Sequence, residues 1–478
     1  MDTTTRHPEH PKLMALLAAQ REAFGQDPMP DLQTRRDRLD RLLRLARQHA
    51  GEIAASISQD FGNRAWQETF VAELATFELR LRHTRGQLAR WMRVRHVPTG
   101  LEYGLARNWQ LPQPLGVVGV LSPWNYPFDL CMSPAIDALG AGNRVMIKPS
   151  ELTPAFSALL ARLVREHFDP TEMTLVEGDA QLAAAFSTLP FDHLIFTGST
   201  AVGRRVAAAA APQLTPLTLE LGGKSPVILD AEADLQHAAE RIAWGKLFNA
   251  GQTCIAPDHV LAPRGRVEEF RERLAAAMAR LYPSLEHNPD YTSIISARHL
   301  QRLHALLDDA AQGGAQLHTV NPAGETFDPA GRKMAPCLVT GLKPDMRLMQ
   351  EEIFGPVLPI LPYDTLDEAL AHVNAHDRPL ALYWFGRHRQ RQERVLRETI
   401  SGGVTLNDCL LHVGQVHQPF GGIGPSGQGA HHGERGFNTF SHFKPVFAQS
   451  RLNGMSLVHP PYGRLLKMAW RWFSGHER

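Results

Sequence analysis

The sequence predicts an α/β fold, in which parallel strands are buried between layers of helices. Short runs in the middle of the chain are apolar at nearly every position, and this pattern is typical of strands that are buried on both faces. These runs alternate with stretches whose apolar residues recur at helical spacing, such as Ala155–Phe168. The alternation favours a doubly wound sheet. The predicted strands are Leu115–Leu121, Arg144–Lys148, Met173–Glu177, His193–Thr197 and Leu217–Leu221.

Further elements are expected on either side of this central region. Before it, residues 31–60 carry leucine and alanine on one face and arginine and aspartate on the other, which predicts one or two amphipathic helices that cover a sheet. After it, a second α/β region runs from about 225 to 430. Helices are predicted there at 232–250, 265–281 and 366–375, and strands at Pro226–Leu229 and Val357–Leu361.

The tail from Gly463 to Phe473 is basic and amphipathic. Its apolar residues lie opposite Arg464, Lys467 and Arg471 at helical spacing, and the segment is too short to span a bilayer. Two interpretations stay open at this point: the helix packs on the body of the protein, or it contacts a membrane surface.

The composition excludes several classes of protein. The chain has 478 residues, of which 43% are hydrophobic and 21% charged, so it is neither collagenous nor disordered. Its length corresponds to about three domains. Lysine and arginine number 50 against 49 aspartate and glutamate, and a net charge of +1 gives no electrostatic reason to expect a nucleic acid partner.

Cysteine usage and the hydropathy pattern indicate the compartment. Four distant cysteines and scattered histidines provide neither a disulfide framework nor a metal-ligand frame, so no bound metal is expected. No apolar run approaches the roughly 18 residues of a membrane span, and the start of the chain lacks the apolar core of a signal peptide. We therefore expect a cytoplasmic protein without an integral membrane segment.

Three polar residues stand where catalysis could occur. Cys254 lies in a glycine-containing stretch after a helix, so a substrate could reach its thiol, although a single cysteine is most often a small buried apolar residue. Glu220 ends an apolar strand, where burial would raise its pKa toward that of a general base, and the alternative is an ion pair with Lys224. Asn125 lies in a loop held by two prolines, so its amide could serve as an oxyanion donor or merely cap a turn.

A glycine-containing turn follows the fourth predicted strand. Gly198, Ser199 and Gly203 lie where that strand gives way to an alanine-rich helix, and the first N–H groups of such a helix can bind a pyrophosphate. The turn lacks the full dinucleotide fingerprint. Lys148 and Glu151 follow a neighbouring strand, where they could bond ribose hydroxyls or form a solvated pair.

Taken together, six motifs between residues 123 and 356 resemble those of the NAD(P)-dependent aldehyde dehydrogenase superfamily, in the same order. The interval between Glu220 and Cys254 is also similar. Later segments, Pro419–Gly422 and Phe437–His442, resemble the class 3 branch, and Arg451–Met455 resembles the bacterial coniferyl aldehyde dehydrogenase type. The resemblance extends over roughly residues 15–462. The six motifs are PWNYP, KPSE, FTGSTAVG, ELGGKSP, FNAGQTC and EEIFGP.

The resemblance implies a covalent mechanism. The thiolate of Cys254 would attack the aldehyde carbonyl and give a thiohemiacetal, whose oxyanion is held by the Asn125 amide and the Cys254 backbone N–H. Loss of a hydride to the nicotinamide would leave a thioester. Glu220 would then activate the water that hydrolyses the thioester to the carboxylic acid.

The resemblance also assigns a dinucleotide cofactor. Lys148 and Glu151 would bond the adenosine ribose, and Ser199 would contact the pyrophosphate. Because the Glu151 carboxylate would repel a 2′-phosphate, NAD is expected, with NADP possible. The residues expected at the cofactor are Lys148, Glu151, Gly198, Ser199, Gly203, Glu352, Phe354 and Trp124.

The resemblance further implies how the chain is divided. A Rossmann-like NAD(P)-binding domain would comprise residues 1–91 and 118–222, and an α/β catalytic domain residues 223–425. Residues 92–117 and 426–455 would form a small β oligomerisation segment, and 456–478 a C-terminal tail. Members of the class 3 branch are typically dimers, in which a strand pair extends the partner's sheet, so a homodimer is expected.

Apolar side chains such as Tyr126, Leu130 and Trp244 are expected to line the substrate tunnel. They predict a hydrophobic aldehyde, either aromatic, such as coniferyl aldehyde, or medium-chain aliphatic. The alternatives are a coenzyme A-acylating aldehyde dehydrogenase, a cysteine hydrolase and a non-catalytic structural protein on the same scaffold. The first has no need of a water-activating base at Glu220, and the third would be expected to lose one of the catalytic residues.

Overall fold

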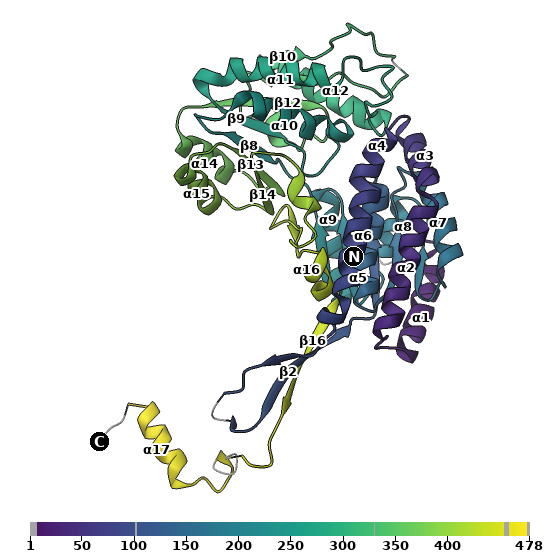
Figure 1. The fold of residues 1–478 in the computed structure, drawn as a ribbon, viewed down its shortest axis with the longest axis vertical. Helices are drawn as coiled ribbons and strands as arrows, with labels where there is room; N and C mark the ends of the chain where they lie inside the picture. The colour runs from purple at the N-terminus through teal and green to yellow at the C-terminus, as the bar shows by residue number, and fades with distance from the viewer. Residues whose placement is uncertain (1–6, 101–102, 329, 454–457, 476–478) are drawn as a thin grey trace.

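The computed structural model describes residues 7–100, 103–328, 330–453 and 458–475. The predicted α/β class is confirmed: two large, mainly parallel sheets are each covered by helices, and a third, smaller sheet projects from them (Figure 1). One large sheet is built mostly from the first half of the chain and the other from the second half. No described helix is long and apolar enough to cross a membrane.

The six-stranded sheet contains all five strands predicted in the middle of the chain, in the order β15-β7-β6-β3-β4-β5. Five of its strands run parallel, and the short β15 is antiparallel to β7. The predicted bounds of β4 and β6 are confirmed, and the other three differ by one or two residues at one end. The strands are β3 Val117–Leu121, β4 Arg144–Lys148, β5 Met173–Leu175, β6 His193–Thr197, β7 Leu217–Glu220 and β15 Gly427–Gln428.

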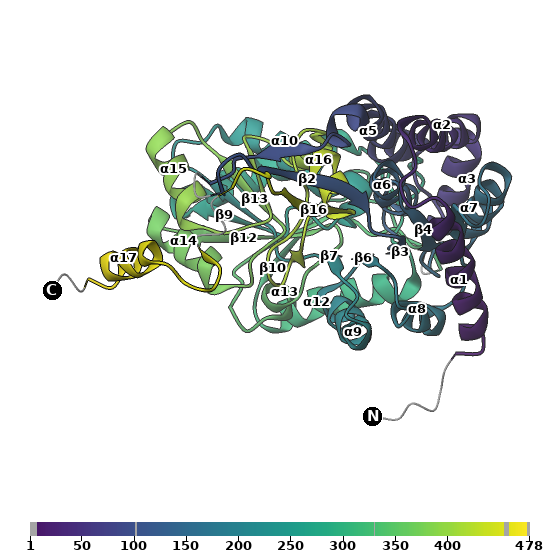
Figure 2. The same ribbon diagram turned by 90° about the horizontal axis from the view of Figure 1, so that it is seen from below.

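Helices cover both faces of this sheet because successive strand residues point to opposite sides. Val118 and Val120 contribute to a core with α2, α3, α5, α6 and α7, whereas Val117 and Leu121 pack with α1, α8 and α9. Figure 2 shows the two helical layers with the sheet between them. The helices are α1 His10–Gln26, α2 Leu32–Gln48, α3 Ala50–Phe61, α5 Thr76–Trp91, α6 Pro127–Gly140, α7 Pro154–His167, α8 Ala180–Ser187 and α9 Thr200–Ala210, so α2 and α3 confirm the amphipathic helices predicted at 31–60.

The seven-stranded sheet has the order β10-β11-β12-β9-β8-β13-β14, and only its edge strand β10 is antiparallel among the described strands. Val227 packs with α10 and α11 on one face, and Ile228 packs with α14 and α15 on the other. The strands are β8 Pro226–Leu229, β9 His259–Pro263, β10 Gln316–Thr319, β11 Cys337–Thr340, β12 Val357–Tyr363, β13 Ala381–Phe385 and β14 Gly403–Leu406; the helices are α10 Leu235–Leu247, α11 Val267–Leu281, α12 Ala297–Gln312, α14 Leu366–Ala375 and α15 Arg389–Glu398.

The third sheet is formed by β1 (Arg95–Val97), β2 (Arg107–Pro114) and β16 (Ser441–Ala448), with β2 and β16 antiparallel along their whole length. Not all of the segment 426–455 belongs to it. β15 joins the six-stranded sheet, and α16 (Gly433–Thr439) packs against α5 and α6. The division into domains and oligomerisation segments stays a prediction, within which β15 is hydrogen-bonded to β7 of the six-stranded sheet.

The tail forms the expected amphipathic helix, α17 (Arg464–Phe473). Figure 1 shows it apart from the three sheets, beyond the free end of the small sheet. The described chain therefore does not support the interpretation that this helix packs on the body of the protein.

The close packing of β3 gives a test of the fold. A Cβ atom at Gly119 would lie 2.7 Å from the Phe191 ring and 2.9 Å from Leu194, so Gly119→Ala should destabilise the protein by about 1–3 kcal/mol through overpacking. Gly86 lies inside α5 with nothing within 4 Å of such an atom. Gly86→Ala should instead stabilise by about 0.5–1 kcal/mol. Thermal unfolding midpoints of the two variants measure the difference, and equal midpoints would contradict the packing described.

Candidate active site

The candidate site lies at the carboxyl ends of the parallel strands of the six-stranded sheet. Of the strands in this sheet, β3 comes first in the sequence and lies near the middle, between β4 and β6. The chain therefore adds later strands on both sides of β3, and the strand order reverses there. Ligands of open α/β sheets bind at such a switch point. The loop after β3 carries Asn125, the turn after β6 carries Ser199, and Glu220 ends β7. The sequence of these connections therefore brings distant polar residues to one edge.

Cys254 reaches this edge from the seven-stranded sheet through a strained turn. α10 ends at Leu247, three residues short of the predicted end, because Asn249, Ala250 and Gly251 have positive φ angles of 53°, 50° and 74°. The left-handed conformation costs about 1–3 kcal/mol at a residue with a Cβ atom. A Cβ atom at Gly251 would collide with the carbonyl oxygen of Gly355. The turn thus needs external support.

Side-chain amides provide that support. Asn249 Nδ2 donates hydrogen bonds to the carbonyl oxygens of Asn125 and Gln252, each at 3.1 Å. Gln252 Nε2 donates to the carbonyl oxygens of Asn249 and Ser293, each at 3.0 Å, and its Oε1 accepts from the Ile295 N–H at 2.9 Å. The turn before Cys254 is therefore tied both to the loop after β3 and to residues 293–295.

The Asn125 amide points toward the same turn. Its Nδ2 donates to the Gln252 carbonyl oxygen at 3.2 Å, which places it two residues from the thiol in the chain, and its side chain is buried. Because an amide nitrogen carries two N–H donors, the second one is available for a ligand oxygen. The Asn125 side chain thus donates to a distant residue, Gln252, and does not only cap its own turn.

A buried ion pair between Arg64 and Glu73 supports the loop after β3. Arg64 Nη1 donates to the Asn125 carbonyl oxygen at 3.0 Å and lies 3.0 Å from Glu73 Oε1. Glu73 Oε2 in turn accepts from the N–H groups of Phe128 and Asp129 in the first turn of α6. Burial raises the pKa of Glu73 to about 7, and the Arg64 charge opposes that rise. Sequence reasoning did not single out Arg64 or Glu73.

Cys254 and Glu220 line one enclosed cavity with a volume of about 30 Å³. A water molecule needs roughly 10–15 Å³ of such space, so the cavity has room for a reacting water. Both carboxyl oxygens of Glu220 are buried without a hydrogen-bond partner, and burial raises its pKa well above the usual value. The alternative pairing with Lys224 is wrong, since the Lys224 ammonium binds Asp258.

Cys254 differs from the other thiols of the chain. Cys131, Cys337 and Cys409 are buried, whereas Cys254 is partly exposed. Burial of its sulfur, followed by the nearby carboxyls of Glu352 and Glu220, raises the pKa of the thiol to about 12, while its own backbone N–H acts in the opposite direction. The residue is therefore partly accessible, and its surroundings favour the neutral thiol.

The cofactor residues predicted on the six-stranded sheet lie along the same edge. Ser199 caps α9, whose first N–H groups have no partners within the helix, and Gly203 lets α9 approach β7, since a Cβ atom there would lie 2.6 Å from Leu221. The Lys148 ammonium is buried, which lowers its pKa, and lies 3.7 Å from the exposed Glu151 carboxylate. A helix N-terminus and a buried cation at a switch point fit a dinucleotide phosphate and ribose.

The remaining cofactor residues form a second group between the two large sheets. The Phe354 and Trp124 rings meet edge to face with centroids 5.4 Å apart, and Phe354 has a positive φ of 50°. The Glu352 carboxyl lies where a Cβ atom of Gly222 would be. Burial, and to a smaller extent the negative charge of Asp258, raises the pKa of Glu352 to about 7. No group of three His, Cys, Asp or Glu side chains that could hold a metal occurs in the described chain.

Apolar and aromatic side chains lie close to the thiol, together with polar ones. Leu130 lines the cavity with Cys254. The Tyr126 hydroxyl is 2.5 Å from Thr253 Oγ1, beside the thiol. Trp244 packs with Phe248 at a centroid distance of 5.4 Å against the core cluster that Cys254 also contacts.

Comparison with known proteins places this arrangement in context. A model of the aldehyde dehydrogenase family matches residues 8–446. A probable coniferyl aldehyde dehydrogenase of Pseudomonas aeruginosa is 47% identical over 97% of this chain and 96% of its own length. The coniferyl aldehyde dehydrogenase of a Pseudomonas species is 46% identical over 95% of each chain. The solved structure of Staphylococcus aureus AldH in a substrate-bound state superposes with a TM-score of 0.91 and 34% identity, over 96% of this chain and 99% of the other.

The buried ion pair behind Asn125 generates a prediction. Arg64→Lys keeps the charge but shortens the side chain, so the nitrogen that now meets both Asn125 and Glu73, Arg64 Nη1, is lost and the oxyanion donor should shift. We expect kcat to fall by about 10- to 100-fold with little change in KM for the cofactor. Arg85→Lys, at an exposed pair with Asp40, is the matched control. A folded Arg64→Lys enzyme with the wild-type kcat would show that Asn125 does not depend on this pair.

Proposed function

Because the chain belongs to the aldehyde dehydrogenase family, we propose that it oxidises a hydrophobic aldehyde, aromatic as in coniferyl aldehyde or medium-chain aliphatic, to the carboxylic acid. One observation carries the proposal: the buried, unpartnered carboxyl of Glu220 lines the same small cavity as the Cys254 thiol. A nucleophile and a base that share space for one water suit hydrolysis of a covalent thioester.

The proposed reaction begins when the Cys254 thiol gives its proton to water and the thiolate sulfur adds to the aldehyde carbon. The oxyanion that forms accepts hydrogen bonds from the Asn125 amide and the Cys254 backbone N–H. NAD(P), which Lys148, Glu151 and Ser199 would hold, would supply the acceptor for the hydride of the same carbon, and that carbon would then be the carbonyl of a thioester. Glu220 then removes a proton from water as the water attacks the thioester, and the thiol leaves with the acid as product. Since burial raises the pKa of Glu220, this last step should slow as the pH falls.

The apolar surroundings of the thiol support the proposed substrate class. Leu130, Leu380 and Phe420 line the cavity beside Cys254, and Trp244 and Phe248 pack against the same core cluster as Cys254. Two of the relatives described above are named for coniferyl aldehyde. A small hydrophilic aldehyde would leave this surface poorly filled, so acetaldehyde should be a worse substrate than hexanal or benzaldehyde.

The position of Glu151 supports NAD over NADP as the preferred acceptor. Its carboxylate is exposed and lies 3.7 Å from the Lys148 ammonium at the edge proposed for the adenosine ribose. A 2′-phosphate at this place would meet a like charge, whereas a 2′-hydroxyl could donate a hydrogen bond to it.

The small sheet supports a homodimer. Among the described strands, β16 pairs only with β2, so its outer edge is open, and an open edge can extend a sheet of a second copy. A cytoplasmic location stays a prediction from the sequence.

Substitution of the two cavity residues tests the mechanism. With NAD and coniferyl aldehyde or hexanal, Cys254→Ala should form no NADH, because no covalent intermediate can form. Glu220→Gln should give a burst of about one NADH per active site followed by slow turnover, because the thioester forms but is not hydrolysed. Stopped-flow absorbance of NADH measures both.

Two results would contradict the assignment. Full steady-state turnover by Glu220→Gln would remove Glu220 as the base. Formation of NADH by the wild type only after coenzyme A is added would favour the acylating alternative, in which a thiol replaces water.

Cofactor preference can be tested at Glu151. Removing the carboxylate with Glu151→Gln should raise the ratio of kcat/KM for NADP to that for NAD by roughly tenfold, which corresponds to one to two kcal/mol of like-charge repulsion near water. Glu166→Gln, on the exposed end of α7, is the control with the same charge change. An unchanged ratio would place the adenosine ribose away from Glu151.

A further inference from the structure

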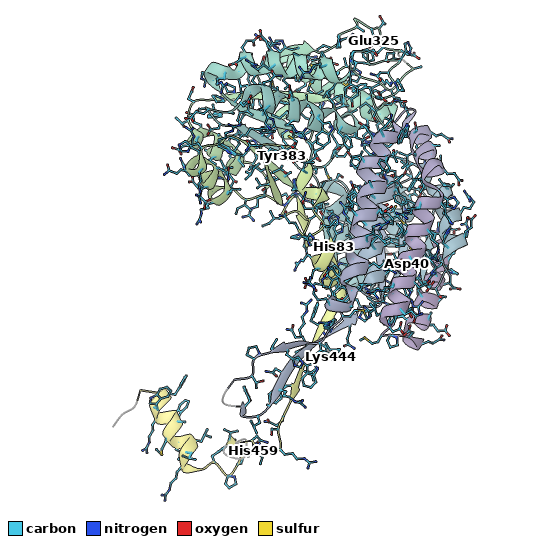
Figure 3. The ribbon with its side chains drawn as sticks, in the orientation of Figure 1. Asp40, His83, Glu325, Tyr383, Lys444 and His459 are labelled. Atoms are coloured by element: carbon cyan, nitrogen blue, oxygen red, sulfur yellow. The ribbon has the colours of Figure 1, made fainter. Side chains whose placement is uncertain are left out.

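α17 presents large apolar side chains to solvent instead of to a core. The exposed fractions are 59% for Leu465, 64% for Met468, 68% for Trp470, 82% for Trp472 and 80% for Phe473. Figure 3 shows α17 beyond the small sheet, away from both large sheets. Such a concentration of exposed apolar surface marks a site of interaction.

The charges of the helix are as strongly segregated as its apolar residues. Arg464, Lys467 and Arg471 are spaced by three and four residues, so they lie on one side of the helix. Leu465, Trp472 and the other apolar residues occupy the rest of its circumference. Helices that lie in the interface of a bilayer typically have tryptophan and phenylalanine on one face and lysine and arginine on the other.

The whole end of the chain is positively charged. Between residues 435 and 475 the sequence has no aspartate or glutamate, although the complete chain is nearly neutral. Anionic headgroups above an apolar interior would complement both the cations and the apolar face of this region. The six cations of this stretch are Arg435, Lys444, Arg451, Arg464, Lys467 and Arg471.

We propose that α17 is an interfacial helix that binds the surface of a bilayer containing anionic phospholipids. Trp472, Phe473 and Leu465 enter the boundary between headgroups and acyl chains, and Arg464, Lys467 and Arg471 contact the phosphates. A ten-residue helix is about 15 Å long, so it lies along the surface and does not cross it. The enzyme is then a peripheral protein, with its catalytic sheets held off the membrane by the small sheet.

Vesicle flotation of the full-length enzyme tests this proposal. The enzyme should float with vesicles of phosphatidylcholine and phosphatidylglycerol (about 7:3) but not with pure phosphatidylcholine, and 0.5 M NaCl should weaken binding because salt screens the cations. Two variants, Trp472→Ser/Phe473→Ser and Lys467→Glu/Arg471→Glu, should each reduce the bound fraction by about tenfold.

A matched control separates the helix from the net charge of the protein. Arg389→Glu/Arg397→Glu changes the charge by the same amount at two exposed residues of α15, which is also ten residues long but packs on the seven-stranded sheet, and should leave flotation unchanged. NADH formation from a water-soluble aldehyde should stay within about twofold in every variant, which shows that the chain is folded.

Three outcomes would overturn the proposal. Flotation of the wild type with neither kind of vesicle would exclude lipid as the occupant. Equal binding by the wild type and both α17 variants would exclude α17 as the contact. A loss of dimer mass in the α17 variants by analytical ultracentrifugation, without vesicle binding by the wild type, would show that a second copy covers the helix. None of these results depends on the assignment of Cys254 or Glu220.

Discussion

The left-handed turn at residues 249–251 is the constraint on which the rest of the site depends. It places Cys254 opposite the loop after β3, but two of its three residues carry a Cβ atom and would not adopt this conformation unaided. The amides of Asn249 and Gln252 supply the missing stabilisation by donating to the carbonyl groups of Asn125, in the loop after β3, and of Ser293, in the segment before α12. The same contacts therefore fold the turn, join the two sheets and fix the nucleophile relative to Asn125.

Closing this site has an electrostatic cost. Burial raises the pKa of Glu73 and of Glu352 to about 7, above the usual value of a glutamate. The folded protein then holds protons on these groups that the unfolded chain releases, so their contribution to the free energy of unfolding decreases as the pH rises from about 4.5 to about 7. The same burial that lowers the free energy of unfolding also excludes bulk water from the place proposed for the thioester.

The parts of the fold that follow from local pattern were predictable from the sequence. β4 and β6 are apolar at successive positions, and their predicted bounds are confirmed because burial on both faces leaves this pattern in the sequence. Arg64 and Glu73 could not be found in this way. Arg64 lies in the loop after α3 and Glu73 in the short helical stretch Phe70–Ala75, neither position has a distinctive sequence pattern, and only tertiary packing buries the pair. Likewise, β15 is two residues long and is defined by its pairing with β7, which local sequence does not reveal.

The shared cavity also sets an order for the chemistry. The Glu220 carboxyl raises the pKa of the Cys254 thiol, so a thiolate and a carboxylate do not form there together without cost. An acylated sulfur carries no charge. It therefore no longer repels the Glu220 carboxylate. Glu220 is thus more readily ionised when the thioester is present than when the free thiolate is. The repulsion between the Cys254 thiolate and the Glu220 carboxylate therefore favours attack by sulfur first and activation of water by Glu220 afterwards.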